Sequence, residues 1–297
     1  MKKLILIISI LALAIGLILS LSGDNTTTAS ASQMTLDSKP IQYITLLCLD
    51  DRLTKPGQSE RDKEIIQLAF EQFEKVAKGH LLINSKDRFL VCIAPQKGND
   101  SNVESFAQSL CFELPKIAAK DRVSTLNDFK TTLSTKIDNL YNAAYRGDQS
   151  SLYDGSDIWT FINSTLPTMT NEEYDTKLLV LSDGYFDFED GKPQLIASNR
   201  STKSEHVFKK FRGNTNAKAE MKAGDFGILK TDKAFANTTL CIAEIYPKHP
   251  DMLEWDILSY LWEDWATECG IGIKKEHIIK SNMPAVTNPA IVEFLRS

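Results

Sequence analysis

Histidine and cysteine are scarce in this sequence, and neither is spaced as in a metal site. The four histidines form no HxxxH or HxxE pattern, and the five cysteines include no CxxC pair. These absences argue against a zinc site and a dithiol redox centre. Cys48, Cys92 and Cys241 lie within apolar runs, which predicts small buried thiols.

An excess of positive charge is also missing. Lys and Arg number 34 against 39 Asp and Glu, so the formal net charge is -5. Binding to phosphate backbones needs a basic face, so nucleic acid is not an expected partner. Ser182 lacks the surrounding Gly-x-Ser-x-Gly elbow, which argues against a serine hydrolase.

The long hydrophobic run lies at the N-terminus. Lys2 and Lys3 precede an apolar stretch over residues 4–21, and a Ser- and Thr-rich segment follows it. This pattern predicts a signal peptide or an N-terminal membrane anchor over residues 1–22 and a flexible linker over residues 23–39. In either case residues 40–297 are expected outside the cytoplasm, in the periplasm or at the cell surface. If uncleaved, the segment holds the protein at the membrane.

Predicted strands and helices alternate through residues 40–297. Apolar runs predict strands at 44–49, 88–94, 177–183, 239–246 and 271–279. Helical spacing of apolar residues predicts helices at 61–78, 123–145, 251–269 and 288–295, the last with Pro289 in its first turn. Residues 105–114 are predicted as either a strand paired with 88–94 or a helix. The alternation predicts an α/β fold, with a doubly wound, mostly parallel central sheet flanked by helices and one antiparallel edge strand.

Residues 185–238 interrupt this alternation. The segment is polar and weakly patterned. Long segments of this kind within compact domains are often binding loops. We expect an insertion with short strands or one helix near residues 205–211.

Acidic residues follow two of the predicted strands. Asp50 and Asp51 end the first strand, and Asp183 ends the strand at 177–183. The carboxyl ends of parallel strands share the edge at which α/β sheets bind ligands, so Asp50 and Asp183 are expected to meet there. Two carboxylates held this close need a cation or a proton between them.

The order of three segments resembles a von Willebrand factor A-type domain over about residues 40–297. They are Asp50-Asp51-Arg52-Leu53-Thr54, Gly155-Ser156-Asp157 and the run Leu-Val-Leu-Ser-Asp-Gly that ends at Gly184. Domains of this family have a Rossmann-like fold and a metal-ion-dependent adhesion site, with Asp-x-Ser-x-Ser, a Thr and an Asp on successive loops. The resemblance implies that Mg²⁺ or another divalent cation is held by Asp50, Thr54, Ser156 and Asp183.

Arg52 occupies the position of a missing hydroxyl in the first motif, so the adhesion site is degenerate. One interpretation is that its guanidinium neutralises Asp50 and Asp183 in place of the cation. Another is that Arg52 points to solvent and that Asp51 or Asp157 completes a weakened metal site. A third is that the acids are a remnant held by hydrogen bonds, with binding done elsewhere.

Two functions from different classes follow. The first is a non-enzymatic, adhesion-type module that recognises a protein partner, through the divalent cation or on the insertion over 185–238. The alternative is a magnesium-dependent phosphohydrolase, because Asp50 to Thr54 also resembles the Asp-x-Asp-x-Thr motif of the haloacid-dehalogenase family. Asp50 would then be the nucleophile, but Arg52 replaces the acidic general acid of that motif.

Overall fold

The computed structural model describes residues 39–98, 101–188, 194–235, 237–249 and 252–297. The predicted signal peptide or anchor and all but the last residue of the predicted linker lie outside the described residues. Within the described ranges, no helix combines the length and the apolar character that crossing a membrane requires.

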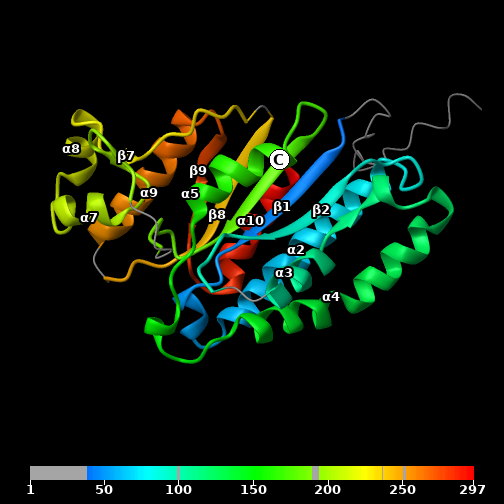
Figure 1. The fold of residues 1–297 in the computed structure, drawn as a ribbon. Helices are drawn as coiled ribbons and strands as arrows, with labels where there is room; N and C mark the ends of the chain where they lie inside the picture. Colours follow the sequence, from blue (N-terminus) through cyan, green and yellow to red (C-terminus); the bar gives the residue numbers. More distant parts are fainter. Residues whose placement is uncertain (1–38, 99–100, 189–193, 236, 250–251) are drawn as a thin grey trace, which may run out of the picture. The chain divides into compact units, whose positions relative to one another are not determined.

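A six-stranded sheet forms the centre of the described chain (Figure 1), in the order β3-β2-β1-β4-β8-β9. Its strands are β1 (Ile41–Leu47), β2 (Arg88–Ile93), β3 (Phe112–Glu113), β4 (Asp175–Leu181), β8 (Thr238–Ile245) and β9 (Gly272–Lys280). All neighbouring pairs are parallel except β2 and β3, which are antiparallel. The predicted α/β class, the mostly parallel sheet and the antiparallel edge strand are therefore confirmed.

The central strands are apolar along their whole length because both faces of the sheet are covered. Side chains alternate between the faces, so Leu46 and Cys48 enter one hydrophobic core whereas Leu47 and Leu49 enter the other. The second core contains residues of α2 (Gln58–Gly79), α3 (Ser101–Ser109), α4 (Arg122–Ala144) and α10 (Pro284–Arg296). The first contains residues of α5 (Ile158–Thr160), the π-helix η5 (Phe161–Thr165), α6 (Leu166–Met169) and α9 (Met252–Glu268).

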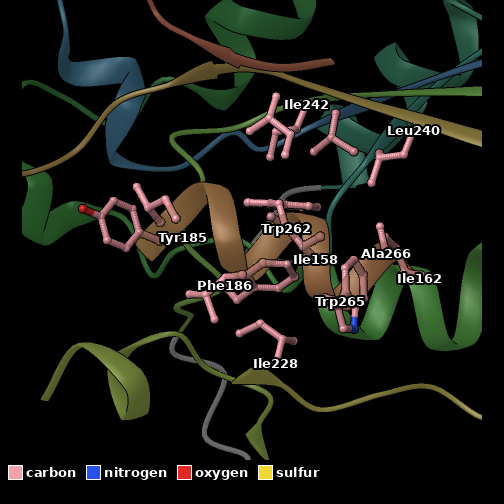
Figure 2. Packing of buried hydrophobic residues seen from close by; sticks show 14 of the residues in the cluster. Ile158, Ile162, Tyr185, Phe186, Ile228, Leu240, Ile242, Trp262, Trp265 and Ala266 are labelled. Carbon is pink, nitrogen blue, oxygen red and sulfur yellow. The ribbon is translucent and has the colours of Figure 1, made fainter. Parts of the chain in front are cut away.

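Aromatic side chains fill the core beneath α9 (Figure 2). The ring of Phe186 lies 4.4 Å from that of Trp262 and 5.0 Å from that of Trp265, measured between centroids. The Trp262 indole also donates a hydrogen bond to the Gly184 carbonyl at 2.8 Å. This packing holds the chain that leaves β4 against α9, and so fixes the position of Asp183.

The predicted insertion is an ordered subdomain over its described residues. It contains α7 (Glu205–Phe211), α8 (Ala217–Ala223) and a small sheet of β5 (Ile196–Ala197), β6 (Arg200–Ser201) and β7 (Gly227–Ile228). The helix expected near residues 205–211 is confirmed. Arg200 joins the insertion to α9, because its guanidinium pairs with Asp225 at 2.7 Å and with Asp264 at 2.8 Å.

One predicted segment combines both of its alternatives, and one predicted helix begins earlier than expected. Within residues 105–114, α3 takes up the first half and ends at Ser109, and Phe112 and Glu113 pair with β2. The closing helix begins at Pro284 rather than near residue 288, and Pro289 lies inside it. Proline suits the first turn because the N–H it lacks has no partner there, and Pro284 takes that position.

In the described parts of the chain, four short 3-10 helices lie in the connections. They are η1 (Asp51–Thr54), η2 (Leu114–Lys116), η3 (Ala119–Asp121) and η4 (Ser150–Leu152). Only η1 separates β1 from α2, so the first loop is short.

Candidate functional site

The carboxyl ends of β1 and β4 bring the two predicted acids together. Leu47 of β1 pairs with Leu181 of β4, and each strand runs on into its acidic residue. Asp50 and Asp183 line one cavity of about 200 Å³, with Asp51 and Lys248 also in its wall. Both carboxylates are buried, with 6% of Asp50 and 5% of Asp183 exposed. The sequence predicted this meeting of the two acids.

Burial and mutual repulsion make Asp50 hard to ionise. Burial, followed by the negative charge of Asp183, raises the pKa of Asp50 to about 7. The charge of Arg52 and a hydrogen bond with Ser156 act in the opposite direction. Burial also raises the pKa of Asp183, although Lys248 and the Tyr185 N–H lower it. A proton or a cation would therefore bind favourably between these acids at neutral pH.

Lys248 provides a positive charge at this edge. Its ammonium lies 3.9 Å from Asp183 and 3.8 Å from Asp51, and its side chain is half exposed. The ammonium also lies 4.9 Å from the ring centroid of Tyr185. The sequence analysis missed Lys248. Lys248 lies three residues beyond β8, the strand next to β4. The loop after β8 therefore lies at the same edge of the sheet as Asp183, and this position was the available signal.

Arg52 does not have either of the two orientations expected for it. Its side chain is 1% exposed, and its guanidinium lies 2.7 Å from Asp62 of α2. It also donates to the Leu181 carbonyl at 3.0 Å. The side chain therefore points neither to solvent nor into hydrogen bonds with Asp50 and Asp183. The cause is Asp62, an acid on the buried face of α2 that requires a cationic partner.

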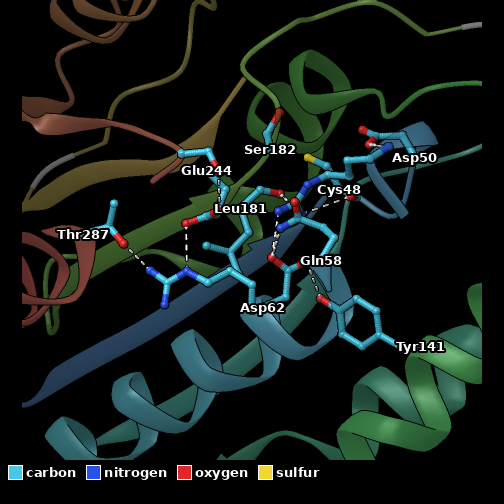
Figure 3. Close-up of polar contacts among 12 residues, drawn as sticks. Cys48, Asp50, Gln58, Asp62, Tyr141, Leu181, Ser182, Glu244 and Thr287 are labelled. Atoms are coloured by element: carbon cyan, nitrogen blue, oxygen red, sulfur yellow. Dashed lines mark hydrogen bonds and ion pairs between the residues drawn. The ribbon is translucent and has the colours of Figure 1, made fainter. Parts of the chain in front are cut away.

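Asp62 receives further hydrogen bonds that complete this network (Figure 3). Tyr141 of α4 donates to it at 2.8 Å, and the Gln58 amide donates at 3.0 Å. Arg52 thus joins the first loop to two helices and to β4. The Arg52 backbone N–H donates to the Asp50 carboxylate at 3.3 Å, whereas the guanidinium charge lowers the pKa of Asp50 without a hydrogen bond between the two side chains.

The other predicted ligands are divided between the site and its surroundings. Ser156 lies at the site, since it is hydrogen-bonded to Asp50 and accepts from the Gln96 amide at 2.8 Å. Thr54 instead donates to the Asp51 carbonyl at 2.7 Å, and it lines a different cavity. Asp157 accepts from the Thr160 N–H at 2.8 Å and so caps α5. The structure therefore brings Asp50, Asp183 and Ser156 together, places Asp51 at the rim, and leaves Thr54 and Asp157 outside.

The insertion also reaches the cavity. Asp187, Lys203 and Glu205 line it beside the acids. Asp187 accepts from the Glu205 N–H at 2.9 Å, and burial raises the pKa of its carboxyl. These residues carried no recognisable motif in the sequence.

The oxygen atoms at this edge are of the kind that a hard divalent cation binds, but they are too few to fill its coordination shell without waters. Asp50 and Asp183 offer carboxylates and Ser156 offers a hydroxyl, and Mg²⁺ accepts such ligands together with waters. Over the described ranges, no group of three or more His, Cys, Asp or Glu side chains is arranged to hold a metal ion. The Lys248 ammonium would have to move aside for a cation to approach Asp183.

Comparison with known proteins does not assign the chain to a family. No family model matches the chain, and no curated protein matches it. Among solved structures, it is similar to crystal form 2 of proximal thread matrix protein 1 from the mussel byssus, with a TM-score of 0.35 and 10% identity. The match covers 87% of this chain and 48% of that one, so the chain spans about half the length of that protein. A TM-score this low supports no conclusion about fold or function.

Proposed function

We propose that residues 40–297 are a von Willebrand factor A-like binding module that recognises a protein partner at the carboxyl edge of its sheet. The observation that carries this proposal is the meeting of buried Asp50 and Asp183 beside half-exposed Lys248 in one cavity. A solvent-facing site with both charge signs, bordered by an insertion, suits recognition of a charged partner surface. The N-terminal apolar run supports a place outside the cytoplasm.

The proposal includes a divalent cation at this edge. Asp50, Asp183 and Ser156 would hold it, and a partner carboxylate would complete its coordination shell. Lys248 competes weakly for the acids, because its two ion pairs are longer than 3.5 Å and its side chain is half exposed. A divalent ion offers a larger charge to carboxylates whose pKa is already raised.

A binding role fits the site better than phosphoryl transfer does. The second position of the phosphohydrolase motif needs a general acid beside Asp50, but Arg52 is directed to Asp62. The first loop contains one short 3-10 helix before α2, which leaves no room for a cap domain there.

Calorimetric titration of Mg²⁺, Mn²⁺ and Ca²⁺ into the purified protein tests the cation. We expect saturable binding by the parent, loss of binding in Asp183→Ala, and tighter binding in Lys248→Met because the competing ammonium is gone. Asp138→Ala, which removes an exposed acid of α4, is the matched control and should bind as the parent does. Absence of saturable binding in both the parent and Lys248→Met would contradict the proposal that a divalent cation binds at this edge.

Partner recognition has its own test. The protein is cross-linked to neighbouring proteins at the surface of its native cell, with and without a chelator. We expect a cross-linked partner that disappears in Asp183→Ala and with the chelator. A partner that is unaffected by Asp183→Ala would place recognition away from this edge.

A further inference from the structure

Strand β2 is paired along only part of its outer edge. β3 pairs with Arg88 and Phe89 alone, although β2 continues to Ile93. The Ala94 N–H donates to the Leu47 carbonyl at 2.9 Å, so Ala94 faces β1. Since backbone groups alternate in direction along a strand, those of Val91 and Ile93 face the outer edge.

The outward backbone groups of Val91 and Ile93 have no main-chain partner among the described residues. Val91 is 2% exposed, and its carbonyl accepts a hydrogen bond from the Cys111 thiol at 3.5 Å. A backbone N–H that is buried without a partner is costly, and native proteins rarely leave one. This edge therefore has unused hydrogen-bonding capacity.

A cavity of about 610 Å³ lies along the same stretch of β2. Residues of both neighbouring layers line it, with Ala107 of α3 on one side and Met169 of α6 on the other. Its wall also includes Cys92, Ile93 and Phe161. The open edge is therefore the floor of a largely apolar groove between two helices.

The other edge of the sheet differs in its charges. β9 exposes Lys274, Lys275 and Lys280, and charged edge strands of this kind resist pairing with other chains. Residues 90–93 of β2 and the following Ala94 carry no charged side chain. Only the β2 edge is left without this protection in the described sheet.

We infer that this groove binds an extended peptide segment of another protein, which adds to β2 as a further strand. Its backbone would pair with Val91 and Ile93, and alternate apolar side chains would enter the cavity. Glu104, Glu113 and Arg88 line the same cavity, and Glu113 already pairs with Lys116 at 2.7 Å. Glu104 is therefore the acid that favours a segment with Lys or Arg between its apolar residues. A second copy of the chain fits poorly. Its own β2 edge lies between its own α3 and α6, and these helices would collide with those that line the groove.

A fluorescent peptide of alternating Val and Lys tests this inference, with anisotropy as the readout. The matched probe is the same peptide with N-methyl groups on alternate residues, which keeps the side chains but removes backbone donors. We expect saturable binding of the first peptide and about tenfold weaker binding of the second, since one or two hydrogen bonds are lost. Equal binding of both, or no binding of either, would overturn the inference.

Variants of the protein provide the second arm. Ile93→Pro removes the outward N–H and leaves the hydrogen bonds with β1 in place, whereas Ile93→Ala shortens the side chain and keeps the N–H. Thr168→Trp fills the groove from an exposed position of α6. We expect weaker peptide binding in Ile93→Pro and Thr168→Trp than in Ile93→Ala.

Three results would overturn the inference in this arm. One is binding that survives both Ile93→Pro and Thr168→Trp. Another is a dimeric parent that becomes monomeric in Ile93→Pro, because a second copy would then occupy the edge. The third applies if Ile93→Pro does not fold: it is peptide binding by Thr168→Trp equal to that of the parent, together with equal binding of the N-methylated and unmodified peptides. None of these variants alters Asp50, Asp183 or Lys248, so cation binding should persist in each folded variant.

Discussion

The guanidinium of Arg52 lies 2.7 Å from the carboxylate of Asp62, and both side chains are almost completely buried. Arg52 and Asp62 are ten positions apart in the sequence, and η1, which contains Arg52, lies between β1 and α2. The ion pair therefore holds the first loop against α2. Asp50 is kept at the sheet edge by the same contact.

Removal of Asp62 should strongly destabilise the fold. Asp62→Ala leaves the Arg52 charge buried without its partner, and we expect the free energy of unfolding to fall by about 4 kcal/mol. Urea denaturation followed by circular dichroism measures the change. Asp138→Ala removes the acid of an ion pair between exposed side chains with Lys63, and should cost about 0.5 kcal/mol or less. Similar losses in the two variants would show that the buried pair is not a strong constraint.

The stability of the protein should depend on the ionisation of Asp50. Its pKa is about 7 when folded and about 3.9 in an unfolded chain. The folded state therefore holds the proton more tightly, so this contribution is fully present below about pH 4 and is lost as the pH rises through 7. Asp50→Asn should remove that loss and make the protein more stable than the parent at pH 8, by up to about 4 kcal/mol. Thermal unfolding across this pH range checks the result, and equal slopes for both proteins would contradict it.

Lys248 should lower the pKa of Asp183 in solution. Lys248→Gln removes the ammonium 3.9 Å from this carboxylate, and we expect the pKa of Asp183 to rise because the charge of Lys248 lowers it. Carboxyl carbon shifts measured by NMR during a pH titration report the value. Lys63→Gln is the control, since Lys63 pairs with Asp138 between α2 and α4 and does not line this cavity. An unchanged Asp183 titration in Lys248→Gln would mean that the two groups do not interact in solution.

Gly155 should be essential for the position of Ser156. Its φ is +75°, and a Cβ atom there would lie 2.3 Å from the Asp187 carbonyl oxygen. Gly155→Ala should therefore destabilise the protein by about 3 kcal/mol or more, because both the backbone angle and the contact become unfavourable. Gly57 has a φ of +80° with open space around it, so Gly57→Ala should cost only about 1 kcal/mol. Chemical denaturation of both variants tests the difference.

The sequence was sufficient to predict those features that depend on apolar pattern and strand ends. It predicted the strands β1 and β4 and the meeting of Asp50 and Asp183 at one edge, because buried parallel strands are apolar runs that end abruptly. The orientation of Arg52 was not predicted, because its partner comes from a helix whose rotation is fixed only by packing. Asp62 lies among the apolar positions of α2. An acid on a buried helix face needs a cationic partner, and this was the available signal that the Arg52 side chain points into the protein.

Lys248 shows a different limit of prediction. Its distance from Asp183 depends on the parallel pairing of β4 with β8, which places two loops at one edge although more than sixty residues separate them. Apolar runs predict such strands but not their order in the sheet. The sequence left residues 105–114 as either a strand or a helix for a related reason, because α3 takes up the first half of the segment and the strand β3 has only two residues.

The central position of β1 has a consequence for how the protein is made. β1 is the first strand in the described chain, yet Ile41 pairs with Asp175 of β4. During synthesis, an apolar strand with one side unpaired must wait until β4 has been added, and such strands aggregate readily. The yield of soluble protein will therefore depend on how well the unfinished chain is shielded until that partner emerges.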